Sequence, residues 1–278
     1  MKKLFFALFL FWGVVVYSNT LQKEISYKLK DASKITTVSF EFINGKARVK
    51  GAKVNSIIVK GTITVRGKEQ SICEDILKNA QLKVKSHGDE LEISLNYEDL
   101  KDKMEDNSGF MGFFCSWGKQ SVVYVDLDIT VPQRLKFDFS GVNFDLELSN
   151  IRNADLSNVN GNVYVVKANK VKCESVNGNI TLRDIVFKAD CEVVNGNLTF
   201  ETKSSKISSI SFESVNGNAD IKLPASVIGT ISTESLTSKT SLIVKGKRTV
   251  KKNLEWEGEG NCDIDVETIN GRIVIEAF

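Results

Sequence analysis

The sequence predicts an all-β protein built mainly as a single-stranded parallel β-solenoid, with a strand-rich N-terminal region and one short helix. Three observations predict it. Apolar and β-branched residues alternate with polar ones over most of the chain, as in "ITTVSFEF" (35–42). The tetrapeptide Val-Asn-Gly-Asn recurs four times, at steps of 17, 18 and 21 residues. The residues that flank it repeat in phase, so one repeating unit is stacked on its copies.

Residues 1–18 have the pattern of a secretory signal peptide. Lys2 and Lys3 precede an apolar run that is shorter than the roughly 20 residues of a membrane-spanning helix, and Val16 and Ser18 suit a cleavage site. An uncleaved N-terminal anchor is the alternative. With cleavage, no transmembrane segment follows, and the chain is expected to be exported to the periplasm, the outer surface or the medium.

Residues 19–132 are expected to form the strand-rich N-terminal part of the solenoid. One stretch, "KEQSICEDILKNA" (68–80), has helical spacing, because Ile72, Ile76 and Leu77 fall on one face. The single histidine, His87, lies in the polar turn "KSHGDE" and is expected to be solvated. A Gly- and aromatic-rich loop at 109–117 precedes a long strand that ends at Pro132.

Residues 133–278 are expected to form the repetitive coils, continuous with the preceding part as one domain. A structural ladder of stacked turns is predicted at Asn160, Gly161, Asn177, Gly178, Asn195, Gly196, Asn216, Gly217, Asn270 and Gly271. The position four residues before each Asn is apolar, as are those three and five residues after it. A worn copy, "LTSKTSLIV" (236–244), falls about one long coil beyond the Asn216 copy, and "INGRIVI" (269–275) closes the chain.

An antiparallel β-meander or sandwich is the alternative architecture, because Asn-Gly between apolar runs is also a strong hairpin signal. The solenoid is favoured because like residues recur at equivalent positions and because length changes fall in one place, "ETKSSKISS" (201–209). In addition, no stretch between copies offers the second tight turn that each hairpin of a meander would need.

Taken together, the leader, the strand-rich lead-in, the strand ending in Pro132, the repeated Gly-containing turns and the terminal "ETINGRIVI" (267–275) resemble the bacterial putative-adhesin domain family of unknown function. The resemblance covers the whole chain after the leader and rests on repetition of short motifs. It implies a β-solenoid fold and an adhesin-like role. The family more often has Ser-Gly-Asp where this chain has Asn-Gly-Asn, which removes a row of acidic residues.

Charge and residue types exclude several functions. Of 37 basic residues two lie in the leader, which leaves 35 against 35 acidic ones and no basic cluster for nucleic acid. The Asn-Gly-Asn turns lead into strands, not helices, so a phosphate loop is not expected. No metal site and no cofactor are expected. We also expect no in-phase carboxylate pair on a cleft, which a glycosidase would need, and therefore no enzyme.

Five cysteines follow the leader, and no Cys-x-x-Cys motif occurs. Cys173 and Cys191 occupy equivalent positions in neighbouring copies, as core thiols or as an opportunistic disulfide. Cys73 and Cys115 could form a second pair. Disulfide connectivity does not follow from sequence alone.

The aromatic loop is the candidate functional feature. Its apolar side chains are expected either to cap the open end of the solenoid or to form a partner-binding patch: Phe110, Met111, Phe113, Phe114 and Trp117. The expected function is therefore an exported, non-enzymatic binding or scaffolding surface at the cell envelope, a putative adhesin with a protein or glycan partner. The alternatives are a periplasmic envelope-stress or assembly component that binds another protein and, further off, a polysaccharide-active enzyme.

Overall fold

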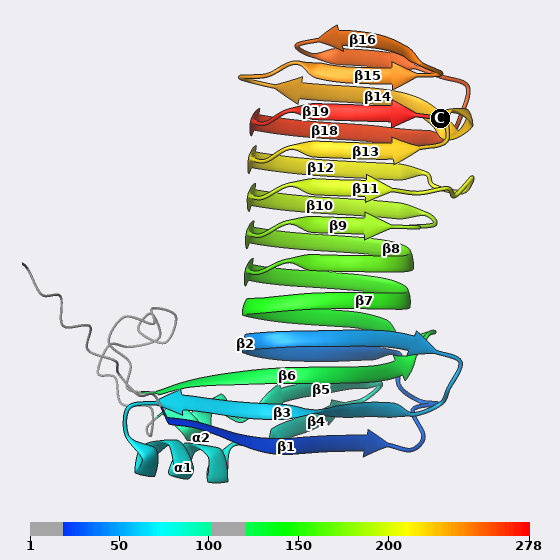
Figure 1. The fold of residues 1–278 in the computed structure, drawn as a ribbon. Helices are drawn as coiled ribbons and strands as arrows, with labels where there is room; N and C mark the ends of the chain where they lie inside the picture. Colours follow the sequence, from blue (N-terminus) through cyan, green and yellow to red (C-terminus); the bar gives the residue numbers. More distant parts are fainter. Residues whose placement is uncertain (1–18, 102–120) are drawn as a thin grey trace, which may run out of the picture.

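The computed structural model describes residues 19–101 and 121–278, which form an all-β structure. Nineteen strands in this part of the chain join in one open, mixed sheet, together with two short α-helices. Figure 1 shows a tall stack of short strands standing on a wider base. The predicted signal peptide (1–18) and aromatic loop (109–117) lie outside the described residues.

The base contains six strands and both α-helices. These are β1 (Asn19–Leu29), β2 (Thr37–Ala52), β3 (Ile57–Gly67), α1 (Gln70–Asn79), β4 (Leu82–His87), β5 (Glu90–Leu95), α2 (Tyr97–Lys101) and β6 (Ser121–Pro132). Strand β3 pairs antiparallel with β1 and β6, and β4 pairs antiparallel with β5. Helix α1 lies within the predicted helical stretch and buries Cys73 and Ile76. Within 19–101 and 121–278, no helix has the length and apolar character needed to cross a membrane.

The stack contains the remaining strands. These are β7 (Lys136–Asn160), β8 (Val163–Asn177), β9 (Ile180–Arg183), β10 (Lys188–Asn195), β11 (Leu198–Glu201), β12 (Ser209–Asn216), β13 (Ala219–Leu223), β14 (Ile228–Ser235), β15 (Thr240–Val244), β16 (Lys247–Lys251), β17 (Leu254–Glu257), β18 (Cys262–Asn270) and β19 (Ile273–Ala277), with a 3-10 turn at Ala225–Val227.

Parallel pairing organises the stack into two ladders. The first ladder holds the strand segments that end at an Asn-Gly turn or its equivalent: the later parts of β7 and β8, then β10, β12, β18 and β14. The second ladder holds the segments that follow the turn: parts of β7 and β8, then β9, β11, β13, β19 and β15. Antiparallel pairs cap the upper end, where β17 lies on β14 and β16 on β15.

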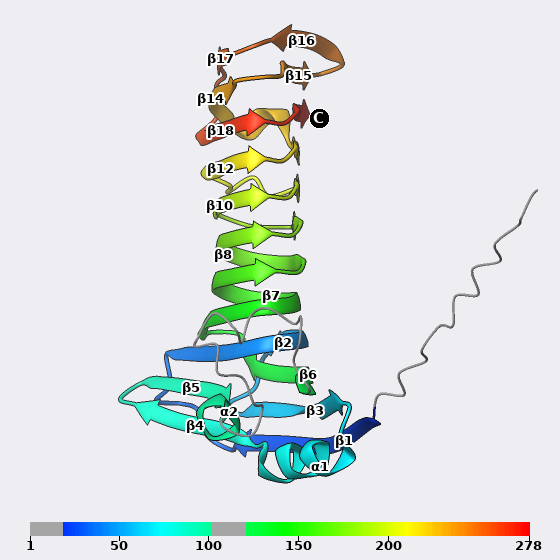
Figure 2. The same ribbon diagram turned by 90° about the vertical axis from the view of Figure 1, so that its left-hand side faces the viewer.

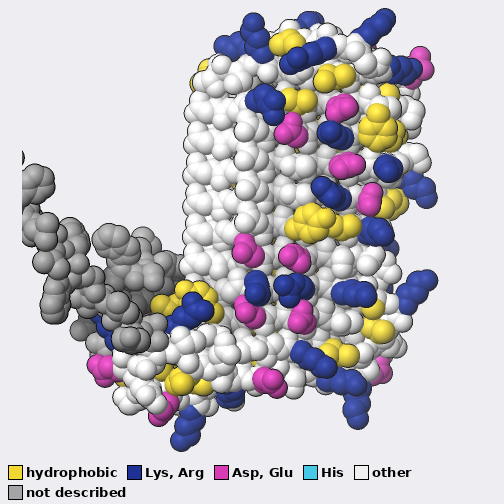
Figure 3. Space-filling model, viewed as in Figure 1, with side chains coloured by type: hydrophobic (Ala, Val, Ile, Leu, Met, Phe, Trp, Pro, Cys, Tyr) yellow, Lys and Arg dark blue, Asp and Glu magenta, His cyan; other side chains and the backbone are white. Residues whose placement is uncertain are grey.

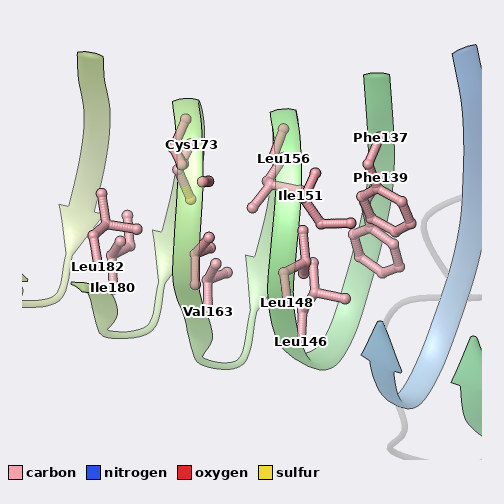
Figure 4. Close-up of a cluster of buried hydrophobic side chains, with 14 of the residues drawn as sticks. Phe137, Phe139, Leu146, Leu148, Ile151, Leu156, Val163, Cys173, Ile180 and Leu182 are labelled. Carbon is pink, nitrogen blue, oxygen red and sulfur yellow. The ribbon is translucent and has the colours of Figure 1, made fainter. Parts of the chain in front are cut away.

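The core lies between the two ladders and is filled by the in-phase apolar positions. Phe139, Leu156, Cys173, Cys191 and Phe212, each four residues before a turn asparagine, are all buried, and their second-ladder counterparts are buried too. Figure 4 shows part of this cluster, with side chains from successive strands pointing into the same space. Towards the base aromatic rings stack, with centroids 5.4 Å apart for Phe40 and Phe137.

Opposite the Asn-Gly turns, three successive corners each contain one residue in the left-handed conformation, a feature that was not anticipated from the sequence. Asn150, Lys167 and Asp184 occupy equivalent places, 17 residues apart, and have φ values of 57°, 60° and 54°. This left-handed conformation is uncommon outside glycine, although asparagine and aspartate adopt it more readily than other residues. A single left-handed residue begins each of these three corners, whereas at the next level the longer segment 202–208 links β11 to β12.

Both ends of the stack depart from sequence order. Strand β2 lies between β6 and β7, and the C-terminal pair β18–β19 lies between the β12–β13 and β14–β15 levels. The "LTSKTSLIV" copy is therefore one level further from the Asn216 copy than the chain order indicates (Figure 1). The residue types at the turn differ: β18 ends in Asn270-Gly271, which continues the turn, whereas the equivalent residues after β14 are Thr237 and Ser238.

Candidate functional site: a glutamate groove beside the asparagine turns

The predicted turn residues lie together along one long edge of the stack. Figure 3 shows this left-hand edge free of charged and hydrophobic side chains. Each first asparagine donates from Nδ2 to Oδ1 of the asparagine one level below, at 2.8–2.9 Å, in an unbroken series. The series runs through Asn44, Asn143, Asn160, Asn177, Asn195, Asn216 and Asn270.

A second polar series runs beside it through the second asparagine of each turn. Asn162 donates from its backbone N–H to Oδ1 of Asp145, at 2.8 Å, and the same bond recurs one level up at each later turn. The last donor is the backbone N–H of Arg272, to Asn218. The polar groups of this edge are thus bonded within the edge, which suits a structural role.

Glycine is required between the two asparagines because successive turns approach closely. A Cβ on Gly178 would lie 1.9 Å from the carbonyl oxygen of Gly161, and Gly196, Gly217 and Gly271 meet the glycine below at 1.8–1.9 Å. Real Cβ contacts are not found at such distances. The repeated glycine therefore reflects contact between stacked turns.

The cysteines of the described residues are buried thiols. Cys173 and Cys191 are register partners in neighbouring strands, and both are free. Burial raises the pKa of the Cys173 thiol to about 12 and that of Cys191 well above its ordinary value. The Cys73 sulfur lies 3.9 Å from the Ser121 hydroxyl oxygen. Cys115 and all five residues of the aromatic patch fall outside the described residues.

A groove of about 720 Å³ runs along the first ladder just before the turns, where it follows three consecutive positions of each repeat. The position three residues before the turn asparagine, or its register equivalent in β14, is glutamate in five adjacent strands. In spatial order this glutamate column is Glu174, Glu192, Glu213, Glu267 and Glu234. At about 4.8 Å per strand the column spans about 19 Å. Figure 2 shows the stacked ends of β8, β10, β12 and β18 that carry it.

An exposed aliphatic column lines the groove beside the glutamates. It occupies the position immediately before the turn asparagine, or the equivalent position at the top level. Its members are Val159, Val176, Val194, Val215, Ile269 and Leu236. They are 38–67% exposed, although side chains of their type are usually buried. Six such residues in a row form a continuous apolar stripe, a kind of surface that often marks an interaction site.

The charge of the glutamate column is mostly unneutralised. Glu174 pairs with Lys172 at 2.5 Å, whereas the other four glutamates form no ion pair with any described residue. Burial and the nearby carboxylates of Asp265, Glu213 and Glu234 raise the pKa of Glu267. Lys252 is the one cation among the described residues that line the groove.

This arrangement corrects one sequence-based expectation. We expected no in-phase carboxylate pair on a cleft, yet five in-register glutamates line one. The signal was present in the repeated "ESV" of Glu174–Val176 and Glu213–Val215, which directly precedes the turn motif. The repeat of apolar positions does not reveal this glutamate column, because the glutamates are exposed. Exposed glutamates line up across strands only if the strands pair in the right register. That register is known only from the tertiary structure.

The groove is suited to binding an elongated, amphipathic, cationic partner. Carboxylates accept hydrogen bonds and attract cations, and the aliphatic column offers apolar contact along the same line. Within residues 19–101 and 121–278, no three His, Cys, Asp or Glu side chains converge in a way that could hold a metal ion. In a stack the carboxylates form a row instead of converging on a point.

No family model matches the chain, and no curated protein matches it in sequence. Solved structures whose backbone is similar to this chain include a putative cell adhesion protein from Clostridium sporogenes ATCC 15579. That structure has 13% identity and a TM-score of 0.37, and the match covers 93% of this chain and all of that one. A putative adhesin from Bacteroides fragilis NCTC 9343 has 11% identity and a TM-score of 0.41, over 91% and 97%. A putative lipid binding protein from Parabacteroides distasonis ATCC 8503 has 13% identity and a TM-score of 0.29, over 92% and 95%.

Proposed function

We propose that the chain is an exported β-solenoid that works without catalysis, as a binding or scaffolding surface at the cell envelope, in the manner of an adhesin. The observation that carries the proposal is the groove, in which the glutamate and aliphatic columns run side by side across at least five strands. A site this long, repeated at five adjacent levels, suits an extended macromolecular partner. The parallel, in-register ladders support the solenoid description.

The surroundings of the glutamates favour binding over hydrolysis. Neighbouring carboxylates one strand apart lie near the spacing of roughly 5 Å used by retaining glycosidases. Such an enzyme, however, needs two carboxyl groups in different environments, one held protonated and one ionised. Here the adjacent Glu192 and Glu213 stand in the same setting: neither forms an ion pair with a described residue, and each is followed by a buried residue and then a valine. Repetition of one environment suits repeated contacts with one ligand.

The experiment measures attachment of the exported chain to cells that produce it. Fluorescently labelled wild-type protein is compared with a double variant, Glu192→Gln and Glu213→Gln, and with a control, Glu24→Gln and Glu201→Gln, that removes two carboxylates elsewhere. We expect the groove variant to lose attachment and the control to keep it. Equal attachment of all three proteins would refute the groove as the binding surface.

Two further measurements test the other parts of the proposal. Fractionation should place the chain, without residues 1–18, in the periplasm, on the surface or in the medium. An uncleaved chain in the cytoplasm would contradict export. Incubation with purified envelope polysaccharides should release no reducing ends. Release that disappears with Glu213→Gln would instead establish a hydrolase.

A further inference from the structure

A basic hairpin forms the upper end of the stack. Strand β16 is exposed at every position and forms, with β15, an antiparallel pair joined at Lys245-Gly246. Five cations lie on or next to this strand: Lys245, Lys247, Arg248, Lys251 and Lys252. Figure 3 shows Lys and Arg side chains gathered at this end. Among them Val250 is 48% exposed, so the hairpin presents an apolar side chain within a positive surface.

None of these five cations forms an ion pair with a described residue. Some lysines at the base and in the lower stack do pair: Lys83, Lys136 and Lys188 each have a carboxylate within 3.2 Å. The upper end differs in that five unpaired cations lie within eight consecutive residues. The hairpin at the upper end thus carries unpaired positive charge, and the groove carries unpaired negative charge, so the two surfaces are complementary. The formal net charge of the whole chain is only +2, and proteins with little net charge associate readily.

We propose that the groove of one molecule receives the basic hairpin of a second copy of this chain. The inference rests on the proposed function, since it names the partner of the groove. The dimensions agree, because a five-residue strand is about 17 Å long and the glutamate column about 19 Å. The chemistry agrees as well. Arg248 and Val250 alternate onto the same face of β16, so the guanidinium can meet a glutamate of the groove while Val250 meets the aliphatic column. Lys247 and Lys251 add positive charge on the opposite face of the hairpin.

The contact is intermolecular because of where the hairpin lies. Strand β16 belongs to the second ladder and is the last level of the stack, whereas the groove follows the first ladder (Figures 1 and 2). Only Lys252, beyond the end of β16, reaches the groove of its own molecule, at the upper end. A hairpin that fits a different surface on its neighbour forms a head-to-side contact, which leaves a free groove and a free hairpin at the two ends of each pair. Contacts of this kind extend into open chains unless a rotation closes them.

Lysines on an edge strand also have a protective explanation, because they prevent the strand from pairing with other sheets. The two explanations predict different behaviour. Protection predicts that removing the hairpin's charge increases association and that the groove's charge has no effect. Docking predicts that reversing the charge on either surface weakens association, and that salt also weakens it by screening exposed charges.

The test is a charge exchange followed by sedimentation velocity of the full exported chain. The hairpin variant carries Lys247→Glu and Arg248→Glu, and the groove variant carries Glu192→Lys and Glu213→Lys. A control carries Lys28→Glu and Lys60→Glu in the base. We expect the wild type and the control to self-associate at low salt, with each surface variant at least about tenfold weaker. An equimolar mixture of the two surface variants should associate again, because the acidic hairpin then meets a basic groove. Thermal melts establish that each variant is folded.

Each other outcome overturns the inference in a distinct way. A wild type that stays monomeric at low salt excludes the second copy as partner. The groove's role in attachment to cells is then decided by the attachment assay of the Glu192→Gln and Glu213→Gln double variant. A mixture that fails to associate, although both variants are folded, excludes the hairpin as the docked element. The inference and the proposed function both fail if neither groove variant has an effect. That is, the lysine variant of Glu192 and Glu213 does not change self-association, and their glutamine variant does not change attachment to cells.

Discussion

Replacing Gly196 by alanine tests whether contact between stacked turns is what makes glycine obligatory. A Cβ at this position would lie 1.9 Å from the carbonyl oxygen of Gly178, whereas ordinary contact begins near 3.4 Å. The two turns would have to separate locally by about 1.5 Å. On the Asn195 side of Gly196 two bonds hold them together: the Gly178 N–H donates to the Asn195 carbonyl at 3.1 Å, and Asn195 Nδ2 donates to Asn177 Oδ1 at 2.9 Å. On the other side, the Asn197 backbone N–H and Nδ2 both donate to Asn179 Oδ1.

The expected loss of stability follows from these contacts. Overpacking costs about 1–3 kcal/mol. Loss of the two hydrogen bonds on the Asn195 side adds about 1 kcal/mol each, so the free energy of unfolding should fall by about 3–5 kcal/mol. The measurement is the urea midpoint, compared at equal slope so that only stability changes.

Gly246→Ala is the matched control. Gly246 has a φ of 78°, but no atom lies within 4 Å of the place that an alanine methyl group would take, so alanine there meets backbone strain without a clash. A left-handed alanine costs about 1–2 kcal/mol. If Gly196→Ala is no more destabilising than Gly246→Ala, close contact is not the reason for the repeated glycine, and our account of the turn column is wrong.

Three further predictions concern the ladder, the thiols and the groove. Asn195→Ala removes two side-chain bonds of the asparagine series and should cost about 1–2 kcal/mol in urea unfolding, whereas Asn270→Ala removes one and should cost about half as much. An equal cost would contradict the additive ladder. Cys173 has a pKa raised to about 12 by burial, so it should resist iodoacetamide at pH 8 in the native chain and react once urea unfolds it, as read by peptide mass spectrometry. Rapid native labelling would show that the core opens there. Glu267 has a raised pKa in the folded state, so the folded chain binds the proton more tightly than the unfolded chain. Stability should therefore fall as the pH rises from the ordinary glutamate pKa to the raised one, and Glu267→Gln should remove that part of the pH dependence. An unchanged pH profile in the variant would refute the assignment.

Much of the stack could be predicted from the chain alone, because its packing depends on local repetition. Leu156, Cys173 and Phe212 were placed in the core by their phase relative to the turn asparagine, and all are buried. Alternation of apolar and polar residues reports which face of a strand is buried, whatever the strand pairs with. The short helix was predictable for the same reason, since the spacing of Ile72, Ile76 and Leu77 is local.

Other features depend on which strands become neighbours. Strands β18 and β19 lie below β14 and β15 because Asn270 and Gly271 continue the turn. This order depends on which of two segments distant in the chain, β14–β15 or β18–β19, pairs with β12 and β13. The left-handed corner at Asn150, Lys167 and Asp184 was not anticipated, because lysine at one of the three places hides the pattern. The basic segment Lys245–Lys252 becomes a hairpin at one end of the stack only through its pairing with β15.

The sequence by itself determined the all-β character, the period of the repeat, the apolar core positions and the column of Asn-Gly turns. Each of these follows from residue spacing within a few positions of the chain. Only the tertiary structure decided the order of levels and the alignment of Glu174, Glu192, Glu213, Glu267 and Glu234 along one groove. The physical reason is that exposed side chains gain no burial energy that would mark their phase. Their grouping is a consequence of the register that the buried residues and the turn contacts impose.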